Sequence, residues 1–311
     1  MRSQLARAPT ARAGPGAAYD LLLRAWHHGS IMSGANQRIS AYVAIGDSFT
    51  EGMNDVAPDG RVLGWADRLA GTLAARDPGF RYANLAVRGK LLRQIVADQV
   101  PAAIDLLADA PGQRLVSIAG GGNDLLRPSG DPDSLAEIFD AAVAQLRRAG
   151  LRVLLITGFD PLAFPLIALL RGKVATYNMH LRAIADAHGC DLLDLWGMRS
   201  LTVPAAWSSD RLHLNSKSHQ QIAVRAAEVL GSLPVADLGG NGQAPLVWSP
   251  PVAAGNRGRG AWLAARIEDY QWAAESFIPW IGRRLRGTSS GDGRSAKHPE
   301  LSPVPQLADD A

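Results

Sequence analysis

Four short segments of the chain contain the residue types that attack on a carbonyl group requires. They are Gly46-Asp47-Ser48, Arg88-Gly89, Gly121-Gly122-Asn123-Asp124 and Asp210-Arg211-Leu212-His213. A serine hydroxyl becomes an effective nucleophile only when a base removes its proton, and an imidazole can do so near neutral pH. Ser48 is therefore the candidate nucleophile and His213 its candidate general base. A turn could bring the Asp210 carboxylate to the His213 ring, where it would fix the useful tautomer.

Each of these residues also has a structural interpretation. A serine between a strand and a helix is most often a helix N-cap, which is the alternative role for Ser48. His219 is a second candidate base, but no acid lies three residues before it. Asp47 and Asp124 are expected to brace turns through side-chain bonds to the backbone. The four segments taken together favour Ser48 as the nucleophile and His213 as its general base.

Residues 41–231 alternate between two patterns that would position these segments. Short runs rich in apolar and β-branched residues predict strands at 41–46, 81–87, 114–119, 152–157 and 190–196. Longer stretches with helical spacing lie near 65–76, 91–108, 133–149, 168–188 and 216–231. Short apolar strands separated by helices predict a parallel sheet covered on both faces. The sequence thus predicts an α/β fold, a three-layer α/β/α sandwich with a five-stranded parallel sheet.

The four segments follow predicted strands or precede the last predicted helix. In an open parallel sheet, ligands bind outside the carboxyl ends of the strands. In these segments and their order, the sequence resembles the SGNH or GDSL hydrolases, and the resemblance extends to Thr50-Glu51-Gly52 and Asn84-Leu85-Ala86. It covers residues 41–231. Phe49 stands where the family's short name has leucine.

The resemblance implies a flavodoxin-like sandwich, a Ser-His-Asp triad and an oxyanion hole. On this sequence the triad is Ser48, Asp210 and His213, and the oxyanion hole consists of Ser48, Gly89 and Asn123. Two backbone N–H groups and the Asn123 amide would stabilise the charge on the attacked carbonyl oxygen. Loss of one such donor typically lowers turnover by ~10²–10³.

Sites of other kinds are not indicated. The glycine run 120–122 is not followed by Gly-Lys-Ser/Thr, so it does not match a phosphate-binding loop. The turn after the first strand lacks the further glycines of a dinucleotide site. The seven histidines are scattered, and none pairs with a carboxylate at metal-ligand spacing. We expect neither a metal nor a cofactor.

The composition sets further limits. Hydrophobic residues make up 47% and charged residues 20%, as in globular proteins. The net charge of +3 is too small to hold nucleic acid. Cys190 is the only cysteine, which excludes an intrachain disulfide and fits a reducing compartment. No apolar run reaches the roughly 18–20 residues of a membrane-spanning helix, so we expect a cytoplasmic protein.

Outside the central domain the pattern changes. We expect a disordered or mis-assigned extension at 1–38, a hydrolase domain at 39–232, a linker at 233–260, an amphipathic helix at 261–286 and a disordered tail at 287–311. The helix would pack its apolar stripe on the domain or on a second subunit. Its aromatic residues and Arg283-Arg284 also fit contact with a membrane surface.

The predicted function is hydrolysis of carboxylic esters with small or medium acyl groups, through an acyl-enzyme on Ser48. The small-molecule ester is the expected partner, with no nucleic acid. The insert Leu162–Leu170 lies near the predicted active edge and favours an acyl or aromatic substrate over a bare sugar. Two alternatives stay open: acyl or acetyl transfer, or deacetylation, by the same triad, and a non-catalytic binding protein that retains the fold.

Overall fold

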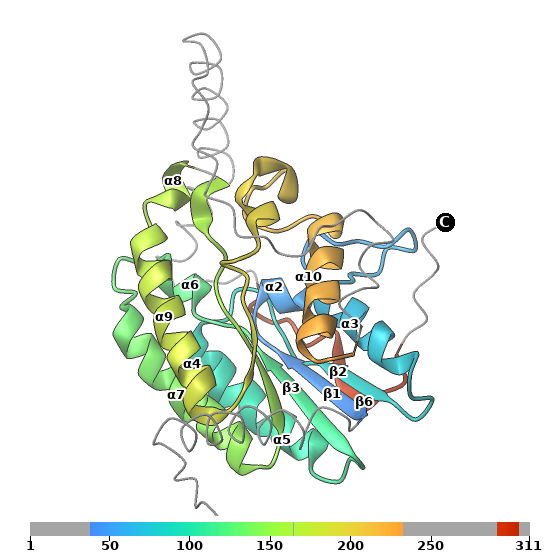
Figure 1. Cartoon of the computed structure of the whole chain (residues 1–311). Helices are drawn as coiled ribbons and strands as arrows, with labels where there is room; N and C mark the ends of the chain where they lie inside the picture. The colour runs from blue at the N-terminus through green and yellow to red at the C-terminus, as the bar shows by residue number, and fades with distance from the viewer. Residues whose placement is uncertain (1–37, 164, 233–290, 305–311) are drawn as a thin grey trace, which may run out of the picture. The chain divides into compact units, whose positions relative to one another are not determined.

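The computed structural model describes residues 38–163, 165–232 and 291–304, which form a sheet with helices on both faces (Figure 1). The strands are β1 (Ile39–Ile45), β2 (Arg81–Asn84), β3 (Gln113–Ile118), β4 (Arg152–Ile156), β5 (Asp191–Leu193) and β6 (His298–Ser302). Their hydrogen-bonded order is β5-β4-β3-β1-β2-β6. Strands β1 to β5 pair in parallel, and β6 pairs antiparallel with β2.

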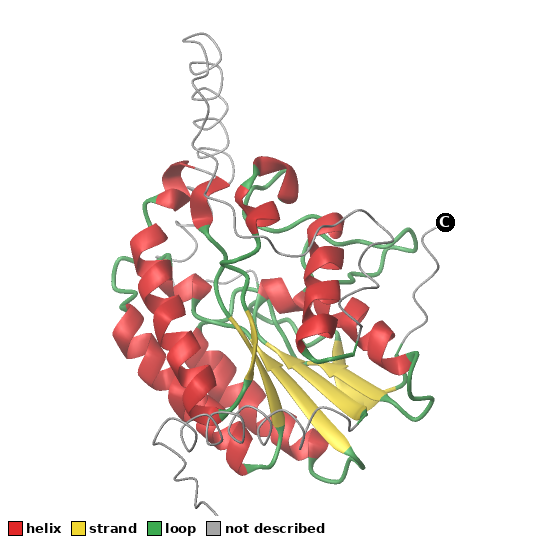
Figure 2. Ribbon diagram, in the orientation of Figure 1, coloured by secondary structure: helices red, strands yellow, loops and turns green. Residues whose placement is uncertain are grey.

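The α-helices alternate with the parallel strands along the chain. They are α2 (Ser48–Glu51), α3 (Trp65–Ala74), α4 (Leu92–Gln94), α5 (Val100–Leu107), α6 (Gly122–Leu125), α7 (Pro132–Arg148), α8 (Pro165–Ala168), α9 (Arg171–His188) and α10 (Ser216–Val229). A π-helix, η1 (Ile95–Gln99), joins α4 to α5. Short 3-10 helices lie at Pro161–Ala163, Arg199–Thr202 and Pro204–Ala206. Figure 2 shows the strands between two layers of helices, with α5, α7 and α9 on one face and α3 and α10 on the other.

The side chains of β1 show why the sheet is buried on both faces. Tyr42 and Ala44 belong to the core shared with α3 and α10, whereas Ala41, Val43 and Ile45 belong to the core shared with α5 and α7. All five are at most 1% exposed. A strand with two buried faces must be apolar at consecutive positions, which is the pattern found in the sequence. The predicted three-layer α/β/α fold is confirmed.

The sheet differs from the prediction at one edge. It has six strands rather than five, because β6 extends it beyond β2, with Tyr82 opposite Ser302 and Asn84 opposite His298. The prediction of a disordered tail at 287–311 is therefore wrong for residues 291–304. The segment lacks the apolar alternation of a strand, and Pro299 discourages one. Its order comes from pairing with the otherwise open edge of β2, which a local sequence pattern cannot reveal.

The remaining predictions concern segments that the structure does not describe. The N-terminal extension, apart from residue 38, and the amphipathic helix at 261–286 with its preceding linker lie outside the described residues. In the part of the chain that the structure does describe, no helix combines the length and apolar character needed to cross a bilayer.

The strand order creates a switch point beside β1. From β1 the chain crosses to β2 on one side and then to β3 on the other side. The loops that follow β1 and β3 therefore diverge, and a crevice opens between them at the carboxyl ends of the strands. These two loops contain Ser48 and Asn123.

A buried glutamine fixes the backbone at the end of β1. Gln99 accepts a hydrogen bond from the Gly46 N–H at 2.7 Å and donates one to the Gly46 carbonyl oxygen at 3.0 Å. Gln99 is only 5% exposed to solvent. Gln99 is the last residue of η1, and π-helical turns are frequent at functional sites. The π turn thus places an amide against the last backbone unit before Asp47 and Ser48.

We expect Gln99→Leu to lower the free energy of unfolding by about 1–3 kcal/mol, because it leaves the buried Gly46 N–H without its acceptor. Urea denaturation would measure the change. Arg93→Ala, at an exposed position of the neighbouring α4, is the matched control and should stay within about 0.5 kcal/mol of the wild type. A Gln99→Leu variant as stable as the control would contradict this role.

Candidate active site

Ser48 is the first residue of α2, directly beyond the end of β1. The N-cap of this helix is Asp47, whose Oδ1 accepts a hydrogen bond from the Phe49 N–H at 3.1 Å. The N-cap interpretation of Ser48 is therefore wrong, and Asp47 braces the turn as predicted. The Ser48 side chain lines a cavity and contacts His213.

The structure brings Ser48, His213 and Asp210 into one hydrogen-bonded chain. His213 Nε2 lies 3.2 Å from Ser48 Oγ, and His213 Nδ1 lies 2.7 Å from Asp210 Oδ2. Asp210 Oδ1 accepts from the backbone N–H groups of Leu212 and His213, at 3.0 and 3.1 Å. One carboxylate oxygen thus holds the turn, while the other faces the imidazole. With Nδ1–H donated to the carboxylate, Nε2 is the nitrogen that can accept the Ser48 proton.

The carboxylate of Asp210 is held in its charged form. Partial burial alone would raise its pKa, but the hydrogen bond and charge of His213, with two backbone N–H donors, outweigh burial and lower the pKa to about 2. Asp210 is therefore ionised at neutral pH. It can stabilise an imidazolium that forms when His213 takes a proton.

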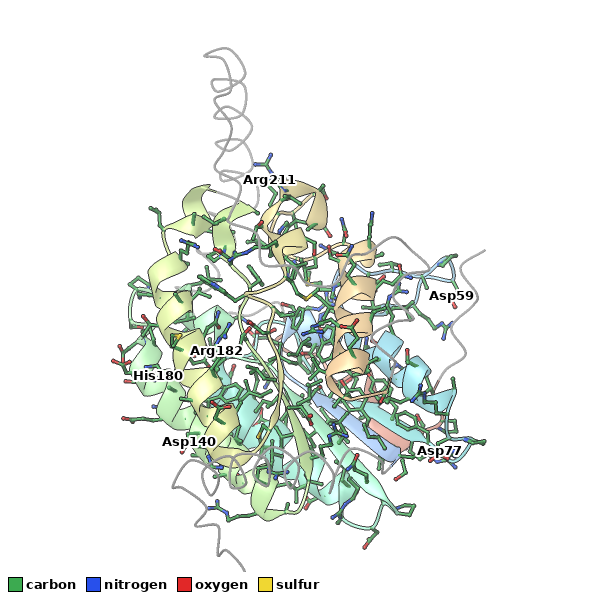
Figure 3. All side chains as sticks on the ribbon, viewed as in Figure 1. Asp59, Asp77, Asp140, His180, Arg182 and Arg211 are labelled. Atoms are coloured by element: carbon green, nitrogen blue, oxygen red, sulfur yellow. The ribbon has the colours of Figure 1, made fainter. Side chains whose placement is uncertain are left out.

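A residue that sequence reasoning missed supports the same carboxylate. Asn54 donates from Nδ2 to Asp210 Oδ2 at 2.7 Å, across a separation of 156 residues. Asn54 and Arg211 are the two described non-glycine residues with positive φ, at 69° and 53°. Asparagine adopts this conformation readily, whereas arginine does so at a cost that its surroundings must offset. The Arg211 side chain lies at the tip of its loop, directed away from the sheet (Figure 3).

Gly89, in the loop after β2, also lines the cavity. Its φ of 79° lies in the left-handed region that glycine occupies without strain. The preceding residue is fixed by an ion pair, because the Glu51 carboxylate accepts from the Arg88 backbone N–H at 2.6 Å and from its guanidinium Nε at 2.8 Å. Glu51 belongs to the same short helix as Ser48, so the serine and the glycine loop are directly connected.

Asn123 also lines the cavity, and its side-chain amide already donates two hydrogen bonds. Its Nδ2 donates to Asp47 Oδ2 at 2.9 Å and to the Lys90 carbonyl oxygen at 3.1 Å. The neighbouring Asp124 accepts from the Leu92 N–H at 3.0 Å, as expected for a bracing residue. The amide of Asn123 therefore reaches a bound oxygen only by sharing or releasing one of its present bonds.

The rival imidazole, His219, has a structural role in this geometry. It is buried in α10, where its Nδ1 accepts from the Trp65 N–H at 3.2 Å and its ring stacks on Phe49. Burial lowers the pKa of His219 to about 4, against the opposing charge of Asp55. The ring is therefore neutral at neutral pH, and it is almost fully buried although it contributes to the lining of the cavity.

The cavity beside Ser48 is large and mainly apolar. It has a volume of about 450 Å³, within the usual range for small-molecule sites. Ser48, Gly89, Asn123, Asp210 and His213 all lie on its wall. The rest of the lining consists largely of aliphatic and aromatic side chains, among them Leu126, Phe159, Ile167, Leu170, Val174, Tyr177 and Trp207. Ile167 and Leu170 come from the insert that the sequence placed at the active edge.

Other histidine–carboxylate pairs lie away from the cavity. His180 contacts Asp133 at 2.7 Å and His188 contacts Asp140 at 2.7 Å, on the outer surfaces of α7 and α9 (Figure 3). Across residues 38–163, 165–232 and 291–304, no three His, Cys, Asp or Glu side chains gather as a metal site requires.

Comparison with known sequences identifies the region that contains this site. The sequence model of the GDSL-like lipase/acylhydrolase family matches residues 44–221. That range includes the Ser48, Gly89, Asn123 and Asp210–His213 segments. No curated protein sequence matches the chain significantly.

Solved structures share the fold. LAE5, an α/β hydrolase enzyme from the metagenome of Lake Arreo in Spain, is 24% identical with a TM-score of 0.50, over 63% of this chain and 96% of its own. TesA is 19% identical with a TM-score of 0.50, over 61% and 97%. Axe2, an acetylxylan esterase from Geobacillus stearothermophilus, is 20% identical with a TM-score of 0.50, over 64% and 95%. At these identities the likeness establishes the fold, and it extends over nearly the whole of each neighbour.

The burial of His219 predicts a pH dependence of stability. Because its folded pKa lies below the ordinary value of 6.5, the unfolded chain binds a proton between pH 6.5 and about 4 that the native ring does not. Native stability should therefore fall as the pH drops through this window, by up to about 3 kcal/mol. Urea denaturation of His219→Gln and the wild type at pH 7 and pH 4.5 would measure the difference, which should shrink toward acid pH. The exposed His180→Gln is the control; the same shrinkage in that variant would refute the assignment.

Proposed function

The chain belongs to the GDSL-like lipase/acylhydrolase family and is an SGNH-type esterase, and from that premise we propose that it cleaves carboxylic esters through an acyl-enzyme formed on Ser48. One observation carries the proposal. The Ser48 hydroxyl, the His213 imidazole and the Asp210 carboxylate form an unbroken hydrogen-bonded chain on the wall of an apolar cavity.

The proposed reaction has two halves. In the first, Ser48 Oγ attacks the ester carbonyl carbon while His213 Nε2 takes its proton, and the resulting imidazolium returns that proton to the leaving alkoxide. In the second, His213 takes a proton from water, the hydroxide attacks the acyl carbon, and the proton passes back to Ser48 Oγ as the acid leaves. Asp210 stays ionised throughout and stabilises the imidazolium in each half.

Three groups are proposed to stabilise the tetrahedral oxyanion. They are the backbone N–H of Ser48, the backbone N–H of Gly89 and the side-chain amide of Asn123. Ser48 begins a helix, where backbone N–H groups have no intrahelical acceptor. All three residues line the same cavity, which supports their convergence on a single oxygen.

The acyl group is proposed to occupy the apolar part of the cavity. Leu126, Ile167, Leu170 and Val174 provide a surface that favours hydrocarbon over hydroxyl groups. Axe2, one of the structural neighbours, is named an acetylxylan esterase, which makes removal of acetyl groups the main competing function. A cavity of about 450 Å³ is far larger than an acetyl group needs, so medium acyl chains are the better fit.

We expect Ser48→Ala to reduce hydrolysis of nitrophenyl esters by roughly 10⁴-fold or more, because no other group replaces the nucleophile. Steady-state release of nitrophenol would measure the loss, and circular dichroism would show that the fold is retained. Ser200→Ala, at an exposed position, is the matched control and should keep wild-type activity.

A fluorophosphonate probe should label the wild type and Ser200→Ala but not Ser48→Ala. Wild-type protein that resists the probe and leaves every ester intact would favour the non-catalytic binding protein. Release of a new ester rather than free acid, with an alcohol present, would identify acyl transfer by the same residues.

Acyl-chain preference should follow the size of the cavity. Each methylene buried in an apolar site contributes about 0.8 kcal/mol, so kcat/KM should rise roughly fourfold per added methylene until the cavity is filled. A series of nitrophenyl esters from acetate to dodecanoate should therefore peak at a medium chain. Val174→Trp should move the peak to shorter esters, whereas Met179→Trp, on the exposed side of the same helix, should not. A peak at acetate would support the acetyl esterase instead.

A further inference from the structure

A lysine from the C-terminal segment lies against the element that bears Ser48. Lys297 immediately precedes β6, and its ammonium contacts four oxygen atoms. They are the carbonyl oxygens of Glu51, Val62 and Leu63, at 2.5, 3.2 and 3.1 Å, and Asp67 Oδ2 at 2.6 Å. The Lys297 side chain is 17% exposed and that of Asp67 is 6% exposed. Fixing a lysine side chain in one conformation costs conformational entropy, which the contacts with these four acceptors must offset.

These acceptors belong to the backbone around the nucleophile. Glu51 is the last residue of α2, which begins at Ser48, and its carbonyl has no acceptor role within so short a helix. Val62 and Leu63 belong to the segment that leads into α3. Lys297 therefore bridges the carboxyl end of α2 and the Val62–Leu63 backbone. A cation at this end of a helix also complements the partial negative charge of its carbonyls.

Glu51 also links Lys297 to the loop that contains Arg88 and Gly89. The Glu51 carboxylate holds both the backbone and the guanidinium of Arg88, the residue before Gly89. The C-terminal segment also touches this loop directly, because a Cβ on Gly291 would lie 2.0 Å from the Arg88 carbonyl oxygen. Only glycine permits the two backbones to approach so closely. The segment thus lies against both elements whose spacing decides whether Ser48 and Gly89 can act on one carbonyl group.

We propose that Lys297 is a positioning residue for the reaction at Ser48, and that it sets the placement of α2 against the Arg88–Gly89 loop although it lies 246 residues from Glu51 in sequence. The inference rests on the proposed ester hydrolysis at that serine. Lys297 does not touch the cavity where the substrate binds, so it acts through Glu51 and its neighbours.

A simpler role for Lys297 would be to neutralise Asp67. This carboxylate is buried, and burial raises its pKa while the charge of Lys297 opposes the rise. Tyr82 also donates to it at 3.3 Å. Removal of Lys297 would leave Asp67 without its cation and destabilise the fold by that route alone. The two roles can be separated by removing the Asp67 charge as well. If Lys297 only neutralises Asp67, that second change should restore both stability and kcat; if Lys297 positions α2, it should restore stability alone.

Two variants of the full-length chain separate the roles, and two further variants serve as controls. Lys297→Met keeps the length of the side chain and removes its charge, and Asp67→Asn with Lys297→Met also removes the buried charge left behind. Lys217→Met, at an exposed position of α10, and Glu300→Gln, at an exposed position of β6, are matched controls. For each, kcat and KM on a nitrophenyl ester, the rate of Ser48 labelling by a fluorophosphonate, and urea denaturation would be measured.

We expect Lys297→Met to lower kcat and the labelling rate by about ten- to a hundredfold with KM within about twofold, because a small displacement of reacting groups has effects of this size. The double variant should regain stability toward urea but not kcat, since the Glu51 and Leu63 carbonyls are still unbridged. Both controls should match the wild type. If Lys297→Met is too unstable to assay, the double variant alone decides.

Wild-type kcat in Lys297→Met, or recovery of both stability and kcat in the double variant, would overturn the proposal and leave Lys297 a stabilising residue only. Failure of the proposed function gives a different result, since the wild type itself would then neither hydrolyse the ester nor take up the probe.

Discussion

The geometry of the site depends on how a four-residue helix is held in place. A helix as short as α2 cannot be stable on its own, because nucleation costs more than so few hydrogen bonds return. Side chains from distant parts of the chain hold each end of it. Asn84 donates to the Thr50 carbonyl oxygen at 3.0 Å, Asn123 donates to its N-cap Asp47, and Lys297 contacts the Glu51 carbonyl oxygen. The orientation of Ser48 thus depends on residues far apart in the chain: one at the end of β2, one in α6 after β3 and one immediately before β6.

Two imidazoles six residues apart show how burial divides roles. His213 lines the cavity, and its Nδ1 lies 2.7 Å from Asp210 Oδ2, a carboxylate whose pKa is lowered to about 2. His219 lies in the core, where burial lowers its pKa and its Nδ1 is committed to a backbone N–H. Both residues are histidines, so their type alone does not distinguish them. Their surroundings make one a candidate base and the other a packing residue that stacks beneath Phe49.

The parallel strands, the layers of helices and the Ser48, Asp210 and His213 grouping could be predicted from sequence, because each has a local signature. Apolar runs predict buried strands, and a carboxylate three residues before a histidine fits in one turn. Strand β6 could not, because it forms by pairing with the distant edge of β2. The contacts of Asn54, Gln99 and Lys297 could not either, because each depends on a polar side chain that meets a partner 53 to 246 residues away. No periodicity marks such a residue. The positive φ of Asn54 is a conformation that asparagine adopts readily, but it is seen only in the structure.

The present bonds of Asn123 bear on how the proposed oxyanion hole would act. Its amide donates to a carboxylate, Asp47 Oδ2, at 2.9 Å and to a neutral carbonyl, that of Lys90, at 3.1 Å. The bond to the carboxylate is the stronger and fixes the plane of the amide. A neutral ester oxygen would compete poorly with the Lys90 carbonyl for the second N–H, since both are uncharged acceptors. An oxyanion would compete well, because charge-assisted hydrogen bonds are roughly twice as strong. In the proposed mechanism the third donor therefore contributes more as charge develops than when the ester first binds, which lowers the barrier rather than merely tightening the initial complex.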